Sequence, residues 1–132
     1  MCIRDRYKID IPFCFNRKEK KEHGEAGLTV GATLRGNVVI VDDVITAGTA
    51  IKESINLIAS AGANVTGIIV GLDRKEKGLT KYSAIQEIQR EYEIPIVSIV
   101  DIDEIIQHVA RHESSKHLLS NISEYREKFG VD

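Results

Sequence analysis

The chain has 132 residues, a formal net charge of −2, 42% hydrophobic residues and 29% charged residues, a length and balance typical of one soluble domain. This charge gives no overall basic character of the kind that favours nucleic acid or an anionic membrane. No apolar run reaches the roughly 18 residues of a membrane helix. Two cysteines, Cys2 and Cys14, are too few for a disulfide framework, so a reducing cytoplasmic location is expected.

The first part of the chain predicts a short strand followed by a loop. Ile9, Ile11 and Phe13 alternate with other residues, which favours a strand in spite of Pro12. Cys14 is expected to be a small buried side chain. The polar stretch 16–27 ends in glycines and predicts a solvated, mobile connection.

The middle of the chain predicts a strand, a helix and a second strand. The β-branched run 38–41 is typical of a strand buried on both faces of a parallel sheet. From Thr49 onward the isoleucines follow helical spacing, and Gly62 is a plausible end of that helix. Residues 65–72 predict the next strand.

The last part continues the alternation, with a helix around 82–88, a strand at 96–100, and helices at 101–110 and 115–128. This order predicts βαβ crossovers, and hence an α/β fold with a parallel sheet flanked by helices. In such sheets, ligands bind beyond the carboxyl ends of the strands. The pairs Asp42-Asp43 and Asp73-Arg74 both stand at that edge.

Residues 38–50 combine a buried strand, two carboxylates, a loop with threonine and glycine, and a helix start. Gly48 allows close approach of the backbone to a ligand, and Thr46 and Thr49 supply hydroxyls. The free N–H groups of the helix suit a phosphate, and the carboxylates suit sugar hydroxyls or a hydrated divalent metal. The ligand implied is a ribose 5-phosphate. The alternative is a purely structural turn, with a threonine as N-cap and a solvated acidic pair.

Residues 38–50 (VVIVDDVITAGTA) resemble the phosphoribosyl pyrophosphate motif of the type I phosphoribosyltransferases. The flanking residues resemble those of one member family, the orotate phosphoribosyltransferases. Residues 13–19 (FCFNRKE), with Lys21, His23, Gly24 and Glu25, resemble the mobile catalytic loop. Residues 71–74 (GLDR), 83–86 (SAIQ) and 125–131 (YREKFGV) resemble downstream segments. The resemblance runs from about Ile9 to the end of the chain.

The resemblance implies a role for each matched residue. Asp42 and Asp43 would meet the ribose hydroxyls, Arg74 would pair with the orotate carboxylate, and Thr46 would also lie near orotate. The residues implied to act in catalysis are Lys21, His23, Asp42 and Asp43. Those implied to bind phosphoribosyl pyrophosphate are Arg17, Lys18, Lys21, His23, Asp42, Asp43, Val44, Ile45, Thr46, Ala47, Gly48, Thr49 and Ala50. Mg²⁺ would be the cofactor, held by pyrophosphate oxygens and water rather than directly by the protein.

The implied protein is a homodimer with shared active sites, in which the loop commonly closes over the neighbouring subunit's pyrophosphate. The implied activity is transfer of ribose 5-phosphate to orotate, giving orotidine 5′-phosphate, a step of pyrimidine (UMP) biosynthesis. Neither a nucleic-acid partner nor a membrane is expected. Cationic lid residues would stabilise the pyrophosphate leaving group.

The beginning of the chain departs from the family pattern. Residues 1–6 (MCIRDR) match nothing in it and resemble translated adapter sequence. We therefore expect residues 1–6 to be a non-native leader and residues 7–132 to be a partial phosphoribosyltransferase domain without its N-terminal part. Such a fragment is expected to be inactive by itself.

Three other functions fit the sequence less well. A purine phosphoribosyltransferase is disfavoured by Arg74 and by the cationic loop. A non-catalytic regulator that senses phosphoribosyl pyrophosphate on the same fold would need a DNA-binding module, and a receiver-type signalling domain would not explain residues 46–50.

His108 and His112 lie four apart, but without an H-E-x-x-H pattern they predict an exposed helix face rather than a metal site.

Overall fold

Three parallel strands organise the described part of the chain in this computed structural model, which describes residues 6–16, 29–78 and 80–131. Strands β3 (Asn37–Val44), β4 (Asn64–Asp73) and β5 (Ile96–Asp101) form a sheet in the order β3-β4-β5. Helix α2 (Thr49–Ser60) connects β3 to β4, and helix α3 (Ala84–Tyr92) connects β4 to β5. The predicted parallel α/β sheet is therefore confirmed.

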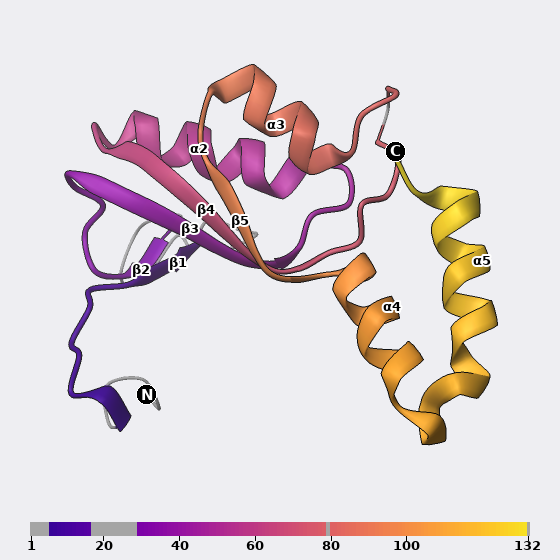
Figure 1. Cartoon of the computed structure of the whole chain (residues 1–132). Helices are drawn as coiled ribbons and strands as arrows, with labels where there is room; N and C mark the ends of the chain where they lie inside the picture. The colour runs from indigo at the N-terminus through magenta and orange to yellow at the C-terminus, as the bar shows by residue number, and fades with distance from the viewer. Residues whose placement is uncertain (1–5, 17–28, 79, 132) are drawn as a thin grey trace.

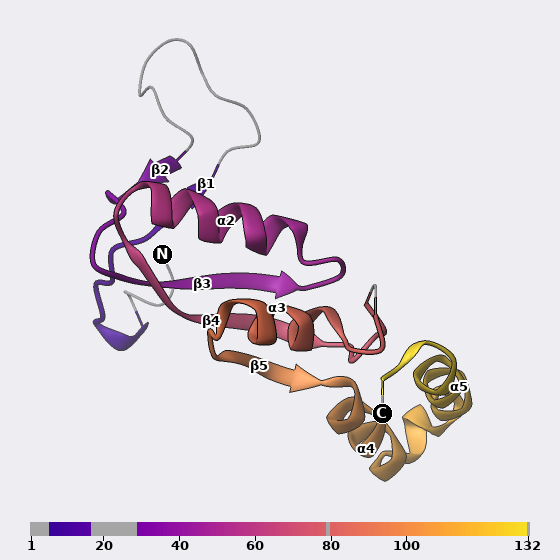
Figure 2. The ribbon, with the colours of Figure 1, turned by 90° about the horizontal axis from the view of Figure 1, so that it is seen from above.

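The core lies between one face of the sheet and the two crossover helices (Figures 1 and 2). Isoleucines at helical spacing put Ile51, Ile55 and Ile58 of α2 inward, and all three are buried. They pack in one cluster with Ile68 and Val70 of β4, which are almost completely buried. The helix ends as predicted, with Gly62 in the left-handed conformation at φ 75° just past the cap.

The opposite face of the sheet is apolar and exposed in the described structure. In the register, Val41 pairs with Ile69, and Ile69 pairs with Val97, so these side chains form a row across the three strands. Val41 and Ile99 are each 74% exposed. The prediction that residues 38–41 are buried on both faces is wrong for this structure, because helices cover only one face of β3 (Figure 1). A β-branched run indicates an apolar strand but not what covers it.

The chain then turns into a helical hairpin beyond the carboxyl end of β5 (Figure 1). Helix α4 (Ile102–Arg111) begins in a capping box of Asp101 and Glu104. The single helix expected over 115–128 is wrong in its first turns, because the 3₁₀ helix η1 (Glu113–Leu118) precedes α5 (Leu119–Phe129). None of the helices in the described residues has the length and apolar character needed to cross a membrane.

A separate antiparallel hairpin, β1 (Cys14–Asn16) with β2 (Thr29–Gly31), brackets residues 17–28. The strand expected over residues 9–13 is displaced to residues 14–16. Pro12 has no N–H to donate, so regular pairing starts only after it, where the Phe13 carbonyl accepts from the N–H of Ala32 at 2.9 Å. Cys14 is half-buried rather than buried. The expected leader, residues 1–6, lies almost entirely outside the described residues.

Candidate functional site

Strand β3 delivers the acidic pair to the carboxyl edge of the sheet, as the sequence predicts. Asp42 is half-buried and Asp43 is exposed. One oxygen of each carboxylate accepts a hydrogen bond from the next backbone N–H, at 2.9 Å from Asp43 to Asp42 and at 2.7 Å from Val44 to Asp43. Each carboxylate therefore keeps one oxygen outside these local bonds, available to a hydroxyl group or a hydrated cation.

The loop after β3 starts helix α2 without a side-chain cap. The N-cap residue is Gly48, at φ 75° and ψ 0°, and no side chain caps the helix. The part of the structural alternative in which a threonine caps the helix is therefore wrong. Gly48 is buried, and a Cβ placed on it would lie 2.9 Å from Cδ1 of Ile88. Glycine is thus required both by the conformation and by the close packing of the loop on α3.

The exposed residues of this segment surround the start of α2. Thr46, Ala47, Thr49 and Ala50 are exposed, whereas Val44 and Ile45 are half-buried, and Ile45 packs against the core. The first-turn N–H groups of a helix carry the positive end of its dipole, and α2 has no acidic residue in its first turn. This arrangement suits a phosphate group.

The side chain of Arg74 connects the end of β4 to the loop that follows β3. It follows β4, and its Nη2 donates to the Thr46 hydroxyl oxygen at 3.0 Å across 28 residues of sequence. The structure therefore brings together the two residues that the sequence assigns to orotate. Thr46 acts as acceptor in this bond, so its own O–H remains able to donate. The side chain of Arg74 is 31% exposed, although its Nε is buried with no hydrogen-bond partner among the described residues.

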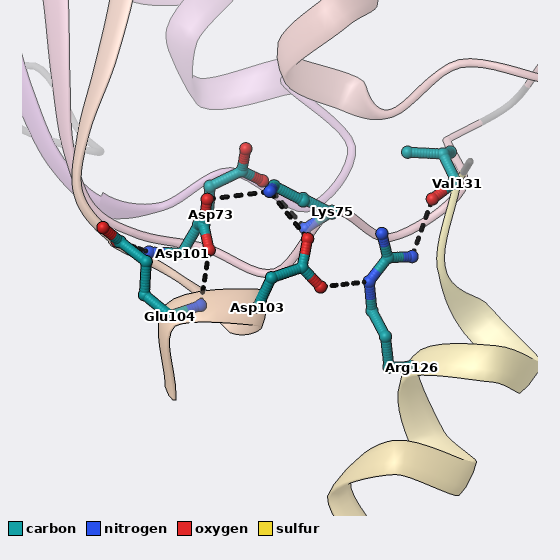
Figure 3. A network of polar contacts seen from close by, with 7 residues as sticks. All are labelled: Asp73, Lys75, Asp101, Asp103, Glu104, Arg126 and Val131. Atoms are coloured by element: carbon teal, nitrogen blue, oxygen red, sulfur yellow. Dashed lines mark hydrogen bonds and ion pairs between the residues drawn. The ribbon is translucent and has the colours of Figure 1, made fainter. Parts of the chain in front are cut away.

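The neighbours of Arg74 face a different region. Lys75 makes ion pairs with Asp101 at 2.7 Å and with Asp103 at 2.8 Å, and Asp103 also accepts from Arg126 at 2.9 Å (Figure 3). The hydrogen bonds that Lys75 donates to Asp101, and then to Asp103, raise the pKa of Lys75 above its ordinary value. Side chains here line a cavity of about 400 Å³ between α3, β5 and the C-terminal hairpin, and none of the predicted site residues lines it.

Glu76 is the site residue to which the sequence assigned no role. Its Oε2 lies 3.1 Å from Nη2 of Arg74, and its Oε1 accepts a hydrogen bond from the Tyr125 hydroxyl. Glu76 stands two residues after Arg74 at the end of a strand, which is a weak local signal. The contact with Tyr125 spans 49 residues, and no sequence spacing indicates it.

The four cationic or titratable residues of the expected lid, Arg17, Lys18, Lys21 and His23, lie outside the described residues. The strands that flank them, β1 and β2, lie beside the C-terminal end of α2, away from the arrowhead end of β3 (Figure 2). Among the described residues, no three side chains of His, Cys, Asp or Glu gather into a metal-binding group. The rings of His108 and His112 stack at 4.2 Å and are exposed.

The family model of the phosphoribosyl transferase domain matches residues 6–105. The chain is 45% identical over 131 residues to orotate phosphoribosyltransferase of Pseudoalteromonas translucida, covering 99% of this chain and 61% of that protein. It is 47% identical to the enzyme of Proteus mirabilis, covering 100% and 62%. A crystal structure of orotate phosphoribosyltransferase from Francisella tularensis matches with a TM-score of 0.78 and 32% identity, covering 98% of this chain and 61% of that one.

The fold and the site thus define an α/β protein with the parallel sheet of the type I phosphoribosyltransferases. The chain belongs to the phosphoribosyl transferase domain family. It spans about 61% of the length of the curated relatives it matches.

Proposed function

We propose that this chain carries the phosphoribosyl pyrophosphate and orotate sites of an orotate phosphoribosyltransferase. The observation that carries the proposal is the 3.0 Å contact between Arg74 and Thr46, which sets a carboxylate-binding side chain beside the start of the phosphate-type loop. The likeness to orotate phosphoribosyltransferases, at 45% identity over 131 residues, supports the same substrate. The reaction would transfer ribose 5-phosphate from phosphoribosyl pyrophosphate to orotate, giving orotidine 5′-phosphate and pyrophosphate.

Different site residues would bind different chemical groups of the ligand. The 5-phosphate would lie on the loop and the uncapped start of α2, because backbone N–H groups there lack side-chain acceptors. The ribose hydroxyls would donate to Asp42 and Asp43. The guanidinium of Arg74 would face the carboxylate of orotate, since its planar donors match a carboxylate. A purine has no carboxylate, so Arg74 would favour orotate over a purine base.

Mg²⁺ is proposed as the cofactor. The free oxygens of Asp42 and Asp43 would accept hydrogen bonds from the water shell of Mg²⁺, which would itself be held by pyrophosphate oxygens and water. When bound, the ion would neutralise the charge of pyrophosphate as it leaves. Asp42 and Asp43 would then orient the ribose and the water around the ion.

A homodimer in the cytoplasm is proposed as the working form. The position of β1 and β2 beside the C-terminal end of α2 supports a lid that acts on a neighbouring subunit (Figure 2). Lys21 and His23 would supply donors to the pyrophosphate from that lid, together with Arg17 and Lys18.

The test is a calorimetric titration of the chain with three ligands: orotidine 5′-phosphate, uridine 5′-phosphate and ribose 5-phosphate. Uridine 5′-phosphate lacks only the carboxylate. The wild-type chain should prefer orotidine 5′-phosphate by about tenfold or more, as expected for a charge-assisted contact. Arg74→Ala should abolish the preference and leave the affinity for ribose 5-phosphate unchanged. A wild-type chain with no preference between the two nucleotides would sink the proposal.

A further inference from the structure

A continuous set of polar contacts connects Arg74 to the C-terminal helix. Nη2 of Arg74 donates a hydrogen bond to the hydroxyl of Thr46 at 3.0 Å and forms an ion pair with Oε2 of Glu76 at 3.1 Å. The other oxygen of Glu76 accepts from the hydroxyl of Tyr125 on α5. Since a guanidinium is planar and rigid, a hydrogen bond and an ion pair on one nitrogen restrict the orientation of the whole group.

The backbone that carries Glu76 is also held by the end of the chain. The N–H of Lys77 donates to the Phe129 carbonyl at 2.8 Å, and the N–H of Val131 donates to the Lys75 carbonyl at 2.8 Å. Glu76 and Gly130 form an isolated antiparallel bridge between these two bonds. Residues 75–77 and 129–131 therefore form one short ladder directly behind Arg74.

The end of the chain is in turn anchored to α4. Nη1 of Arg126 donates to the Val131 carbonyl at 2.7 Å, while its Nε donates to Asp103 at 2.9 Å (Figure 3). The ring of Tyr125 packs on Phe129 with centroids 5.0 Å apart. The Tyr125 side chain therefore has both a packed ring and a bonded hydroxyl, which limits its freedom to leave Glu76.

We propose that Glu76 and Tyr125 are positioning residues, which hold the guanidinium of Arg74 toward the carboxylate of the base. The inference rests on the proposed function for the identity of the ligand. Nη2 is engaged by the hydrogen bond to Thr46 and the ion pair with Glu76, so a ligand carboxylate would be met by the other donors of an oriented group. The C-terminal helix thereby becomes part of the specificity for the base through the bond from Tyr125 to Glu76.

The test uses the same pair of nucleotides on three variants of the chain. Glu76→Gln removes the charge that orients Arg74 and should lower the preference for orotidine 5′-phosphate over uridine 5′-phosphate by about tenfold. Tyr125→Phe keeps the ring and removes one hydrogen bond, so a fall of about fivefold is expected. The exposed neighbour Glu124 provides a charge-matched control, and Glu124→Gln should keep the full preference. All three should bind ribose 5-phosphate as the wild type does.

An unchanged preference in Glu76→Gln would overturn the inference. An increased preference would overturn it too, because Glu76 would then compete with the ligand for Arg74 rather than orient it. A wild-type chain without any preference would instead mean that the proposed function is wrong.

A second measurement tests, without a ligand, whether Glu76 and Tyr125 position the side chain of Arg74. The buried Nε–H of Arg74 should exchange slowly with solvent in the NMR spectrum of the wild-type chain. Exchange should become several-fold faster in Glu76→Gln and in Tyr125→Phe, but not in Glu124→Gln. Equal exchange rates in all four proteins would overturn the inference.

Discussion

At the residue scale, the acidic pair and the glycine of the loop perform separate tasks. The carboxylates of Asp42 and Asp43 bond only locally in the described hydrogen bonds, each to the next backbone N–H. Gly48 instead has a packing role, because it lies against Ile88 in the core. Changes at the acidic pair should therefore affect the ligand, whereas changes at Gly48 should affect the fold.

The double variant Asp42→Asn/Asp43→Asn should lose affinity for phosphoribosyl pyrophosphate without losing stability. An Asn side-chain oxygen can still accept the bonds from Asp43 N–H and Val44 N–H, but it lacks the charge that strengthens a bond to a hydroxyl or to hydrated Mg²⁺. Loss of about 1.5–3 kcal/mol per charged contact corresponds to a fall of at least tenfold, measured by calorimetry with Mg²⁺ present. Glu53→Gln, on the exposed side of α2, is the control. Unchanged binding in the double variant would contradict the assignment.

Gly48→Ala and Gly62→Ala should differ in stability although both glycines have φ 75°. A Cβ at Gly62 meets nothing within 4 Å, whereas at Gly48 it would lie 2.9 Å from Ile88. Each change costs about 1 kcal/mol for a left-handed alanine, and Gly48→Ala adds about 1–3 kcal/mol of overpacking. Chemical denaturation of both variants measures the difference. Equal losses would show that Ile88 moves aside freely.

At the element scale, one polar network attaches the α4–α5 hairpin to the end of β4. Lys75 bridges Asp101 and Asp103, and Arg126 bonds Asp103 from α5 (Figure 3). The bond from Arg126, and then that from Lys75, lowers the pKa of Asp103 below its ordinary value of 3.8. The bond from Lys75 lowers the pKa of Asp101 in the same direction.

These pKa shifts predict a pH dependence of the free energy of unfolding. A carboxylate with a lowered pKa in the folded state stabilises the fold above its ordinary value of 3.8, and this stabilisation is lost as the pH falls through the lowered value. Lys75 has a raised pKa, so its contribution is complete below 10.5 and is lost as the pH rises through the raised value. The network should therefore contribute most between about pH 5 and pH 10.

Asp103→Asn tests this dependence. The side chain of Asp103 is 41% exposed, so solvent screens the ion pairs and we expect a loss of only about 1 kcal/mol at pH 7 in low salt. The difference from the wild type should shrink as the pH falls from 3.8 through the lowered pKa of Asp103, because the wild-type carboxyl becomes protonated over that range. Denaturant titrations at several pH values, with Glu53→Gln as control, give the comparison. A loss that stays constant with pH would exclude an ionic origin.

At the scale of the whole molecule, the two faces of the sheet have opposite surroundings. Helices α2 and α3 cover one face, and the other exposes Val39, Val41, Ile69, Val97 and Ile99. An apolar face of this kind favours association or aggregation. We therefore expect the chain to associate through this face.

Val41→Thr/Ile99→Thr should reduce this association without weakening the fold. Threonine keeps the β-branched shape that suits a strand, and both positions are 74% exposed, so a change in stability within about 0.5 kcal/mol is expected. Light scattering and binding of a hydrophobic dye should both fall. Ile68→Thr, at a position only 1% exposed, is the contrasting variant and should cost about 2–4 kcal/mol. Unchanged scattering in the double variant would contradict the role of this face.

The sequence alone was enough to predict most of the helices and strands and their order. Helical spacing of Ile51, Ile55 and Ile58 predicted α2 and its buried side, and the β-branched runs predicted β3, β4 and β5 in parallel order. Local sterics and hydrogen bonding set these periodicities, so they are visible in a window of a few residues. The same locality placed Asp42-Asp43 and Arg74 at the carboxyl edge of the sheet, since that edge follows from the alternation of strands and helices.

Only the tertiary structure decided which side chains meet and which faces are covered. The contact of Arg74 with Thr46 spans 28 residues, and that of Tyr125 with Glu76 spans 49. Whether such pairs form depends on the register between the strands and on where α5 packs. Neither is encoded in a local sequence pattern. The exposure of Val41 is likewise decided by tertiary structure. An apolar side chain indicates that burial is favourable, but it does not show whether another element covers it. The sequence therefore determined the elements and the edge where the site lies, and the packing of distant segments determined the orientation of Arg74.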